Sequence, residues 1–137
     1  MRQFYIFNIN NEFKYNIKID EYVLYKVFEE LHNMSEEEVK YGINIYNNIV
    51  NPINKKYFNN TLYNLYKNND YYTKFMDTHL YNNFFDKENS KLIIKNSYIE
   101  IDTTSIKPSF FNYLNKNKNL FVCDFENKDY FWLESIA

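Results

Sequence analysis

The stretch that decides the fold lies near the end of the chain, where residues 120–133 read LFVCDFENKDYFWL. Apolar, β-branched and aromatic residues dominate 120–125 and 129–133, and such residues favour extended strands. The polar Glu126, Asn127 and Lys128 between them suit a turn. The pattern predicts a terminal antiparallel β-hairpin.

A second hairpin is predicted a short way upstream. Residues 91–95 and 98–102 are strand-like, and Asn96 and Ser97 form a two-residue turn between them. Pro108 follows and suits the first turn of a short helix that carries Phe110, Phe111 and Leu114.

The beginning of the chain predicts a third hairpin. Residues 3–9 are strand-like, and Asn10 and Asn11 tolerate the backbone of a tight turn. From 12 to 19 apolar and polar residues alternate strictly, so the predicted strand carries one apolar face. That face consists of Phe13, Tyr15, Ile17 and Ile19.

Three longer helices are expected in the middle of the chain. Residues 20–32 carry an apolar stripe at helical spacing after a good N-cap, Asp20. Ser35 and Glu38 form a capping-box pattern, and the helix that follows must end before Pro52. A third helix is expected over 54–67.

Residues 71–90 are ambiguous, because 71–76 fits a strand and the rest resembles a long loop. Helices and hairpins are segregated along the sequence rather than alternating. The fold class is therefore α+β, with a mainly antiparallel sheet and three to four helices. A length of 137 residues fits a single domain over 1–137.

The composition excludes several function classes. The single glycine, Gly42, leaves no phosphate-binding loop, and a net charge of -2 with one arginine lacks the basic signature of nucleic-acid binding. No apolar run is long enough to span a membrane, so no membrane partner is expected. One cysteine, Cys123, fits a reducing compartment, and a cytoplasmic location is expected.

No catalytic or metal-binding constellation is visible. His32 and His79 have no second ligand at a suitable spacing, and Cys123 lies in an apolar strand where a buried thiol is inert. We therefore expect no metal, cofactor or small-molecule substrate, and no enzyme. One alternative stays open: Lys55 and Lys56, with aromatic neighbours, resemble a small nucleic-acid-binding patch.

Three segments share features with one known protein family. They are residues 2–28, with Phe4-Tyr5-Ile6 and Glu12-Phe13; Ile49-Val50-Asn51-Pro52-Ile53; and the hairpin at 120–133, with Ile99-Glu100-Ile101 as a further strand. In these residues the chain resembles the sporulation inhibitor of replication protein family (SirA) of spore-forming bacteria.

The resemblance implies a non-enzymatic inhibitor that binds the N-terminal domain of the replication initiator DnaA and blocks initiation of chromosome replication. It also implies partner contacts at Phe13, Ile17 and Asn47. Ile17 falls where the family has an aromatic residue. Phe13 and Ile17 would share one strand face, which either packs on the first helix or stays exposed as a docking patch.

Overall fold

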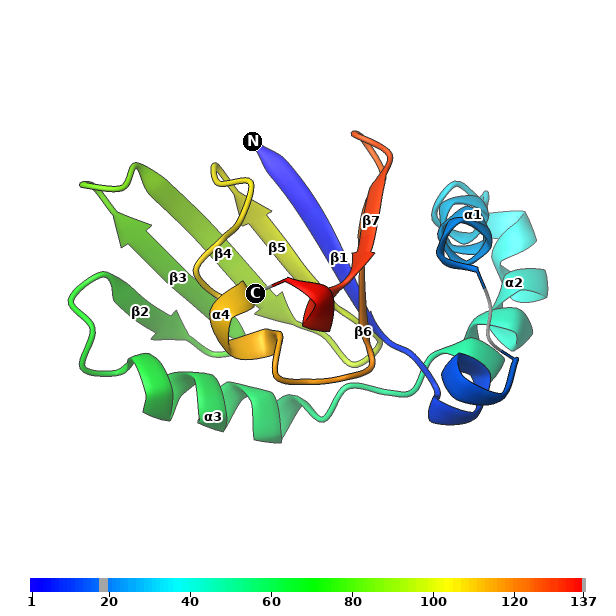
Figure 1. The fold of residues 1–137 in the computed structure, drawn as a ribbon, viewed down its shortest axis with the longest axis horizontal. Coiled ribbons are helices and arrows are strands. Elements are labelled where there is room, and N and C mark those ends of the chain that lie inside the picture. Colours follow the sequence, from blue (N-terminus) through cyan, green and yellow to red (C-terminus); the bar gives the residue numbers. More distant parts are fainter. Residues whose placement is uncertain (18–19, 137) are drawn as a thin grey trace.

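The computed structural model describes residues 1–17 and 20–136, and for residues 16 and 17 it describes the backbone alone. Within these residues seven strands form one antiparallel sheet in the order β2-β3-β4-β5-β1-β6-β7 (Figure 1). The strands are β1 (Arg2–Asn8), β2 (Tyr72–Phe75), β3 (Thr78–Asn83), β4 (Glu88–Ile94), β5 (Ile99–Thr103), β6 (Leu120–Asp124) and β7 (Asp129–Trp132). The α+β class with an antiparallel sheet is confirmed.

Helices cover the sheet on both faces. They are η1 (Phe13–Ile17, a π-helical turn), α1 (Glu21–His32), α2 (Glu36–Ile49), α3 (Lys55–Tyr66), α4 (Phe111–Leu114) and η2 (Leu133–Ser135, a 3-10 turn). The α1–α2 pair lies beside β6 and β7, whereas α3 and α4 lie on the other side of the sheet (Figure 1).

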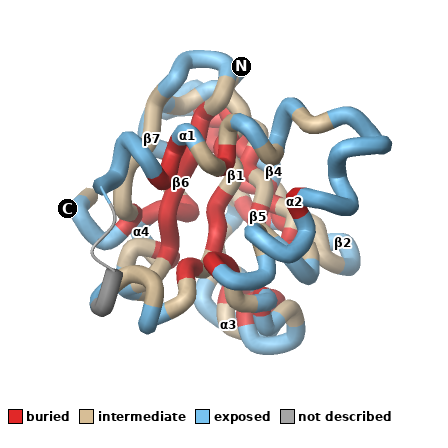
Figure 2. Tube along the Cα trace, turned by 90° about the vertical axis from the view of Figure 1, so that its right-hand side faces the viewer, coloured by how far each residue is buried: buried red, intermediate tan, exposed pale blue. Residues whose placement is uncertain are grey.

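The alternation of side chains along β1 divides the core into two apolar clusters. Phe4 and Ile6 point into the cluster under α3 and α4, whereas Phe7 points into the cluster under α1 and α2. Buried residues concentrate along β1 and β6, in the middle of the fold (Figure 2). β1 is therefore central to the fold, because its side chains contribute to both apolar clusters.

The sheet confirms two of the three predicted hairpins. β4 and β5 pair with Ile94 opposite Ile99, across the predicted turn. β6 and β7 pair with Asp124 opposite Asp129. The helices predicted over 20–32 and 54–67 and after Pro108 are also present. Asp20 and Asn54 cap their helices by accepting hydrogen bonds from the backbone N–H groups of Tyr22 and Tyr57.

The predicted N-terminal hairpin is wrong. β1 pairs with β5 and β6, so neither of its edges is left for a strand at 12–19. Instead the side-chain oxygen of Asn10 accepts hydrogen bonds from the N–H groups of Glu12 (2.8 Å) and Phe13 (3.4 Å), which caps a helical turn. Residues 18 and 19 of the predicted strand lie outside the described residues.

Two further expectations need correction. The strand that fitted 71–76 is present as β2, but the rest of 71–90 is not a long loop, because β3 pairs with β2 in a hairpin and β4 begins at Glu88. Ser35 occupies the N-cap position before α2, but its hydroxyl does not accept from the backbone and instead donates to the Glu38 carboxylate at 2.9 Å. Polar residues in short strands explain the first error, since their alternation carries little apolar signal.

Candidate protein-binding site

The short helix η1 is held at one end of the sheet by contacts of Lys14. The Lys14 N–H donates to the Asn10 carbonyl at 2.9 Å, and the Lys14 ammonium lies over the Trp132 ring, 4.4 Å from its centroid. Lys14 also pairs with Glu134 and donates to the Lys118 carbonyl. These contacts fix η1 against the C-terminal hairpin.

Phe13 is the first residue of η1 and is half-buried. It packs against the apolar cluster under α1 and α2. Phe13 thus contributes to the core in part, and the rest of its side chain stays accessible to solvent. The backbone of Ile17 lies about one helical turn further on, which replaces the shared strand face that the sequence predicted. The Ile17 side chain lies outside the described part of the structure.

Asn47 lies in the last turn of α2, and its side chain is exposed. The end of α2 is joined to the segment that precedes η1. The Asn10 N–H donates to the Ile49 carbonyl at 2.7 Å, and the Asn51 N–H donates to the Asn8 carbonyl at 2.8 Å. The structure therefore brings the elements that carry Phe13 and Asn47 to the same end of the sheet.

A hollow of about 370 Å³ adjoins Asn47. Amide side chains and Ser97 supply its polar groups, and it opens to solvent between α2 and the β4–β5 turn. It is lined by Tyr46, Asn47, Val50, Asn51, Pro52, Asn96 and Ser97. Amides can both donate and accept hydrogen bonds, so this end of the sheet offers uncharged polar contacts to a partner.

A second cavity of about 370 Å³ continues from this hollow and shares Tyr46 and Ser97 with it. We call it the aromatic cleft; its other lining residues are Tyr5, Phe7, Phe28, Leu31, His32, Val39, Tyr98 and Phe125. The His32 ring stacks on Phe125 with centroids 4.3 Å apart. Burial raises the pKa of the Tyr5 and Tyr46 hydroxyls, which are neutral donors at physiological pH.

The comparison with known families decides the identity. A family model described as sporulation inhibitor of replication protein SirA matches residues 2–137. The chain belongs to the SirA family. A search of curated proteins finds no match.

Family membership supports a role for this SirA-family chain in inhibiting replication during sporulation. It also agrees with the resemblance found in the sequence, which rests on segments from both ends of the chain. The match covers both sides of the sheet, including η1, the end of α2 and the aromatic cleft. Every element that builds the candidate site thus belongs to the family region.

Of the two histidines in this SirA-family fold, His32 lines the aromatic cleft and His79 lies in the interior. His79 is fully buried and bonds to the Tyr72 hydroxyl and to Asn59 Oδ1, each at 2.7 Å. Burial lowers the pKa of His79 to about 4, so its ring is neutral. These buried hydrogen bonds give His79 a structural role in the interior. The search of the described residues finds no group of three or more His, Cys, Asp or Glu that could hold a metal ion.

Cys123 is buried in β6, as predicted, and burial raises the pKa of its thiol. The thiol is therefore protonated and chemically inert. Within the described residues, no helix is long and apolar enough to cross a membrane.

The predicted basic patch is weaker in the structure than in the sequence. Lys55 pairs with Asp77, with the Lys55 Nζ and Asp77 Oδ2 atoms 2.8 Å apart, and this ammonium lowers the pKa of the Asp77 carboxyl. Lys56 is exposed beside it. Because Asp77 balances one of the two cations, the patch carries little net charge for a phosphate backbone.

Sequence reasoning missed the aromatic cleft. Its lining comes from β1, α1, α2, the β4–β5 turn and the residue after β6, so no local pattern marks it. The one available signal was the high aromatic content of 21%, which could not say where the rings meet.

Proposed function

We propose that this chain inhibits chromosome replication by binding the N-terminal domain of DnaA, without catalysing a reaction. The contact surface consists of Phe13 and Ile17 on η1 and Asn47 on α2. Because initiation takes place on the chromosome, the protein acts in the cytoplasm. The inert Cys123 thiol is compatible with that reducing compartment.

The observation that carries the proposal is the set of backbone hydrogen bonds between the segment before η1 and the end of α2. Phe13 and Asn47 are 34 positions apart in the sequence, yet the hydrogen bonds of Asn10 and Asn51 bring their elements together. A half-buried aromatic residue beside exposed amides is a typical arrangement at the centre of a protein interface. This arrangement supports a single contact surface for the residues that the family resemblance implies.

The direct test is a calorimetric titration of the purified DnaA N-terminal domain from the same host. We expect a complex with the unaltered chain, and an affinity at least 30-fold lower for Phe13→Ala, which corresponds to about 2 kcal/mol for loss of an interface anchor. Because Phe13 is half-buried, the free energy of unfolding should fall by only about 1 kcal/mol.

A matched control is Phe75→Ala, because Phe75 is an exposed aromatic residue on β2, outside the contact surface. It should bind like the unaltered chain. Absence of a complex with the unaltered chain at micromolar concentrations would contradict the proposal. Equal losses of affinity for Phe13→Ala and Phe75→Ala would contradict the placement of the surface.

A further inference from the structure

The aromatic cleft lies open beside α2, a helix that contacts the rest of the molecule mainly through a narrow strip of its surface. All residues of α2 are described, and only Gly42 and Ile49 are buried. A Cβ atom at position 42 would lie 2.7 Å from both Leu31 and Met34, so the glycine allows α1 and α2 to approach closely. This packing leaves Val39, which lines the cleft, 43% exposed. The cleft is therefore accessible from solvent along α2.

Ring contacts fix the walls of the cleft. Phe7 and Phe28 are buried and stacked, with their centroids 4.1 Å apart and their planes at 4°. The Tyr5 ring lies 5.4 Å from the Phe125 ring and 5.6 Å from the Tyr98 ring. Because each ring is held by its neighbours, the cavity is preformed, as binding cavities usually are. Its aromatic faces suit an aliphatic or aromatic side chain, and they also attract cations.

Acidic side chains line two cavities that continue from the cleft along α1. The first cavity shares His32 with the cleft and is also lined by Glu29 and Glu126. The second shares Glu29 with the first and is also lined by Glu30 and Glu38. Within the described residues, no lysine or arginine lines any of the three cavities. We call the cleft and these two cavities together the groove.

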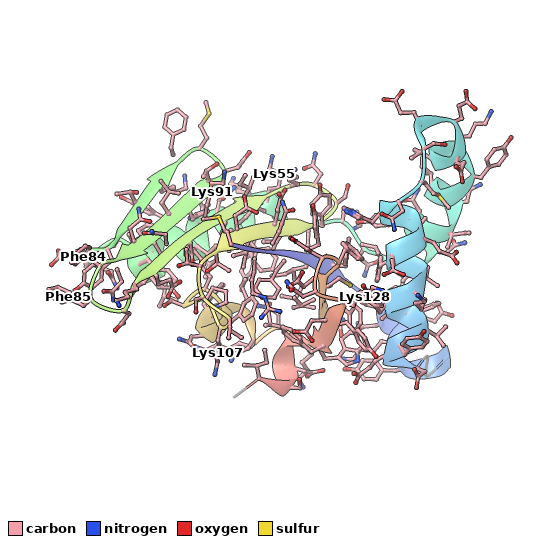
Figure 3. All side chains as sticks on the ribbon, turned by 90° about the horizontal axis from the view of Figure 1, so that it is seen from above. Lys55, Phe84, Phe85, Lys91, Lys107 and Lys128 are labelled. Atoms are coloured by element: carbon pink, nitrogen blue, oxygen red, sulfur yellow. The ribbon has the colours of Figure 1, made fainter. Side chains whose placement is uncertain are left out.

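Two lysines near the acidic end of the groove balance part of its charge. Lys26 Nζ lies 2.9 Å from Glu29 Oε1, and Lys128 lies beside α1 (Figure 3). The hydrogen bond from Lys26 and the charge of Lys128 both lower the pKa of the Glu29 carboxyl. Four carboxylates thus face two lysines at this end. Residues 20–49, which form α1 and α2 with their flanks, carry a formal charge of -5, against -2 for the whole chain. The groove is therefore apolar at the cleft and anionic beside it.

We propose that the groove binds an extended basic segment of a partner protein. One apolar side chain of the segment occupies the aromatic cleft, and its lysine or arginine side chains lie along Glu30 and Glu126. Charge complementarity decides between kinds of partner. A formal charge of -5 over residues 20–49 repels a nucleic acid or an anionic membrane surface. An apolar anchor flanked by cations matches both the aromatic rings and the carboxylates beside them.

The inference does not rest on the proposed function. The groove contains none of the three residues of the proposed contact surface, although the cleft adjoins the hollow beside Asn47. The two surfaces can be tested separately, because Phe13→Ala alters only the contact surface and Val39→Lys alters only the groove. A peptide probe without any other part of a partner reports on the groove alone.

The test is fluorescence anisotropy of the full chain with a labelled synthetic peptide that has a central leucine between two Lys-Arg pairs. The unaltered chain should bind it, with an affinity that falls as salt is added. Val39→Lys should lower the affinity by about tenfold or more, because it places a cation at the cleft. The matched control is Ile45→Lys, which adds the same charge at a 49% exposed residue of α2 that does not line the cleft. It should change the affinity by less than about twofold.

The carboxylates are tested by a second pair of variants. E30Q/E126Q should lower the affinity for the peptide about fivefold at low salt, since both side chains line the groove. E36Q/E37Q removes the same charge from exposed residues of α2 that do not line it, and should change the affinity by less than about twofold. A peptide with the same leucine between pairs of glutamates should not bind.

Circular dichroism should show all variants folded, and Phe13→Ala should bind the peptide like the unaltered chain, whatever its effect on binding to the DnaA N-terminal domain. The inference is overturned if the unaltered chain does not bind the basic peptide at millimolar concentrations, or if it binds the glutamate peptide equally well. Equal losses for Val39→Lys and Ile45→Lys would also overturn it. So would a dimer of the unaltered chain that Val39→Lys abolishes, because a second copy would then cover the cleft.

Discussion

The Asn10 side chain donates a hydrogen bond to the Asn51 side-chain oxygen at 3.4 Å, and so joins the turn before η1 to the segment after α2. The same Asn10 caps η1 through its own side-chain oxygen. One asparagine thus sets both the shape of η1 and its position relative to α2. The proposed contact surface depends on this residue even though Asn10 is not proposed as a contact.

Asn10→Ala should therefore weaken partner binding indirectly. Loss of the cap should lower the free energy of unfolding by about 1 kcal/mol, and the affinity for the DnaA N-terminal domain should fall because η1 loses its fixed position. Asn10→Asp keeps the capping oxygen and should restore most of the stability. Urea unfolding and calorimetry measure the two effects. Equal affinities for both variants and the unaltered chain would show that η1 needs no cap.

Asn47 and Asn48 provide a matched pair on α2, because both are exposed and adjacent positions on a helix point about 100° apart. Asn47→Ala should lower the affinity for the DnaA N-terminal domain about five- to tenfold, as expected for loss of one interfacial hydrogen bond. Asn48→Ala should leave it unchanged. Neither substitution should shift the thermal midpoint measurably, since neither side chain is buried. A larger loss of affinity for Asn48→Ala than for Asn47→Ala would place the contact on the face of α2 that carries Asn48.

The terminal hairpin was predictable because its information is local. Residues 120–133 hold two apolar runs and the turn that joins them, and β6 and β7 pair as that pattern requires. Most of the helices were predictable for the same reason, since their caps and apolar stripes lie within the segments themselves. The fold class follows from these local elements.

The N-terminal segment was not predictable in this way. The strands that pair with β1 in place of residues 12–19 lie far away in the sequence. Residues 12–19 alternate like a strand, but the two edges of β1 are taken by β5 and β6, about 100 residues further along. The candidate site also depends on contacts between residues that are distant in the sequence. Phe13 and Asn47 could be named from family resemblance, but the contact between Asn10 and Asn51 that unites them spans 41 positions and leaves no local pattern.

Arg2 and Asp124 supply a third prediction, on stability. Arg2 Nε lies 3.0 Å from Asp124 Oδ2, and the Asp124 side chain is fully buried. Arg2→Ala should lower the free energy of unfolding by about 2–3 kcal/mol, because it leaves a buried carboxylate without its cation. Adding Asp124→Asn should recover part of the loss by removing the charge.

The control for this pair is Lys91→Ala. Lys91 and Asp102 form a longer, more exposed pair at 3.8 Å, so their separation should cost less than about 0.5 kcal/mol. Urea unfolding at pH 7 measures all three variants. Similar losses for Arg2→Ala and Lys91→Ala would show that burial of Asp124 does not determine the cost.

His79 makes a prediction about pH. Its hydrogen bonds fit the tautomer in which Nε2–H donates to Asn59 and Nδ1 accepts from the Tyr72 hydroxyl. The pKa of His79 is about 4 in the folded protein, against about 6.5 for an unfolded chain. Between these values the unfolded state binds the extra proton, so the free energy of unfolding must fall as the pH falls.

We therefore expect the unaltered chain to lose about 2 kcal/mol of stability between pH 7 and pH 5, as measured by urea unfolding. His79→Phe cannot take up the proton, so its stability should vary less over that interval by the same amount. At pH 7 the variant should be less stable, since the Tyr72 hydroxyl and Asn59 lose their partner. If both proteins show the same change between pH 7 and pH 5, His79 is not the group that titrates.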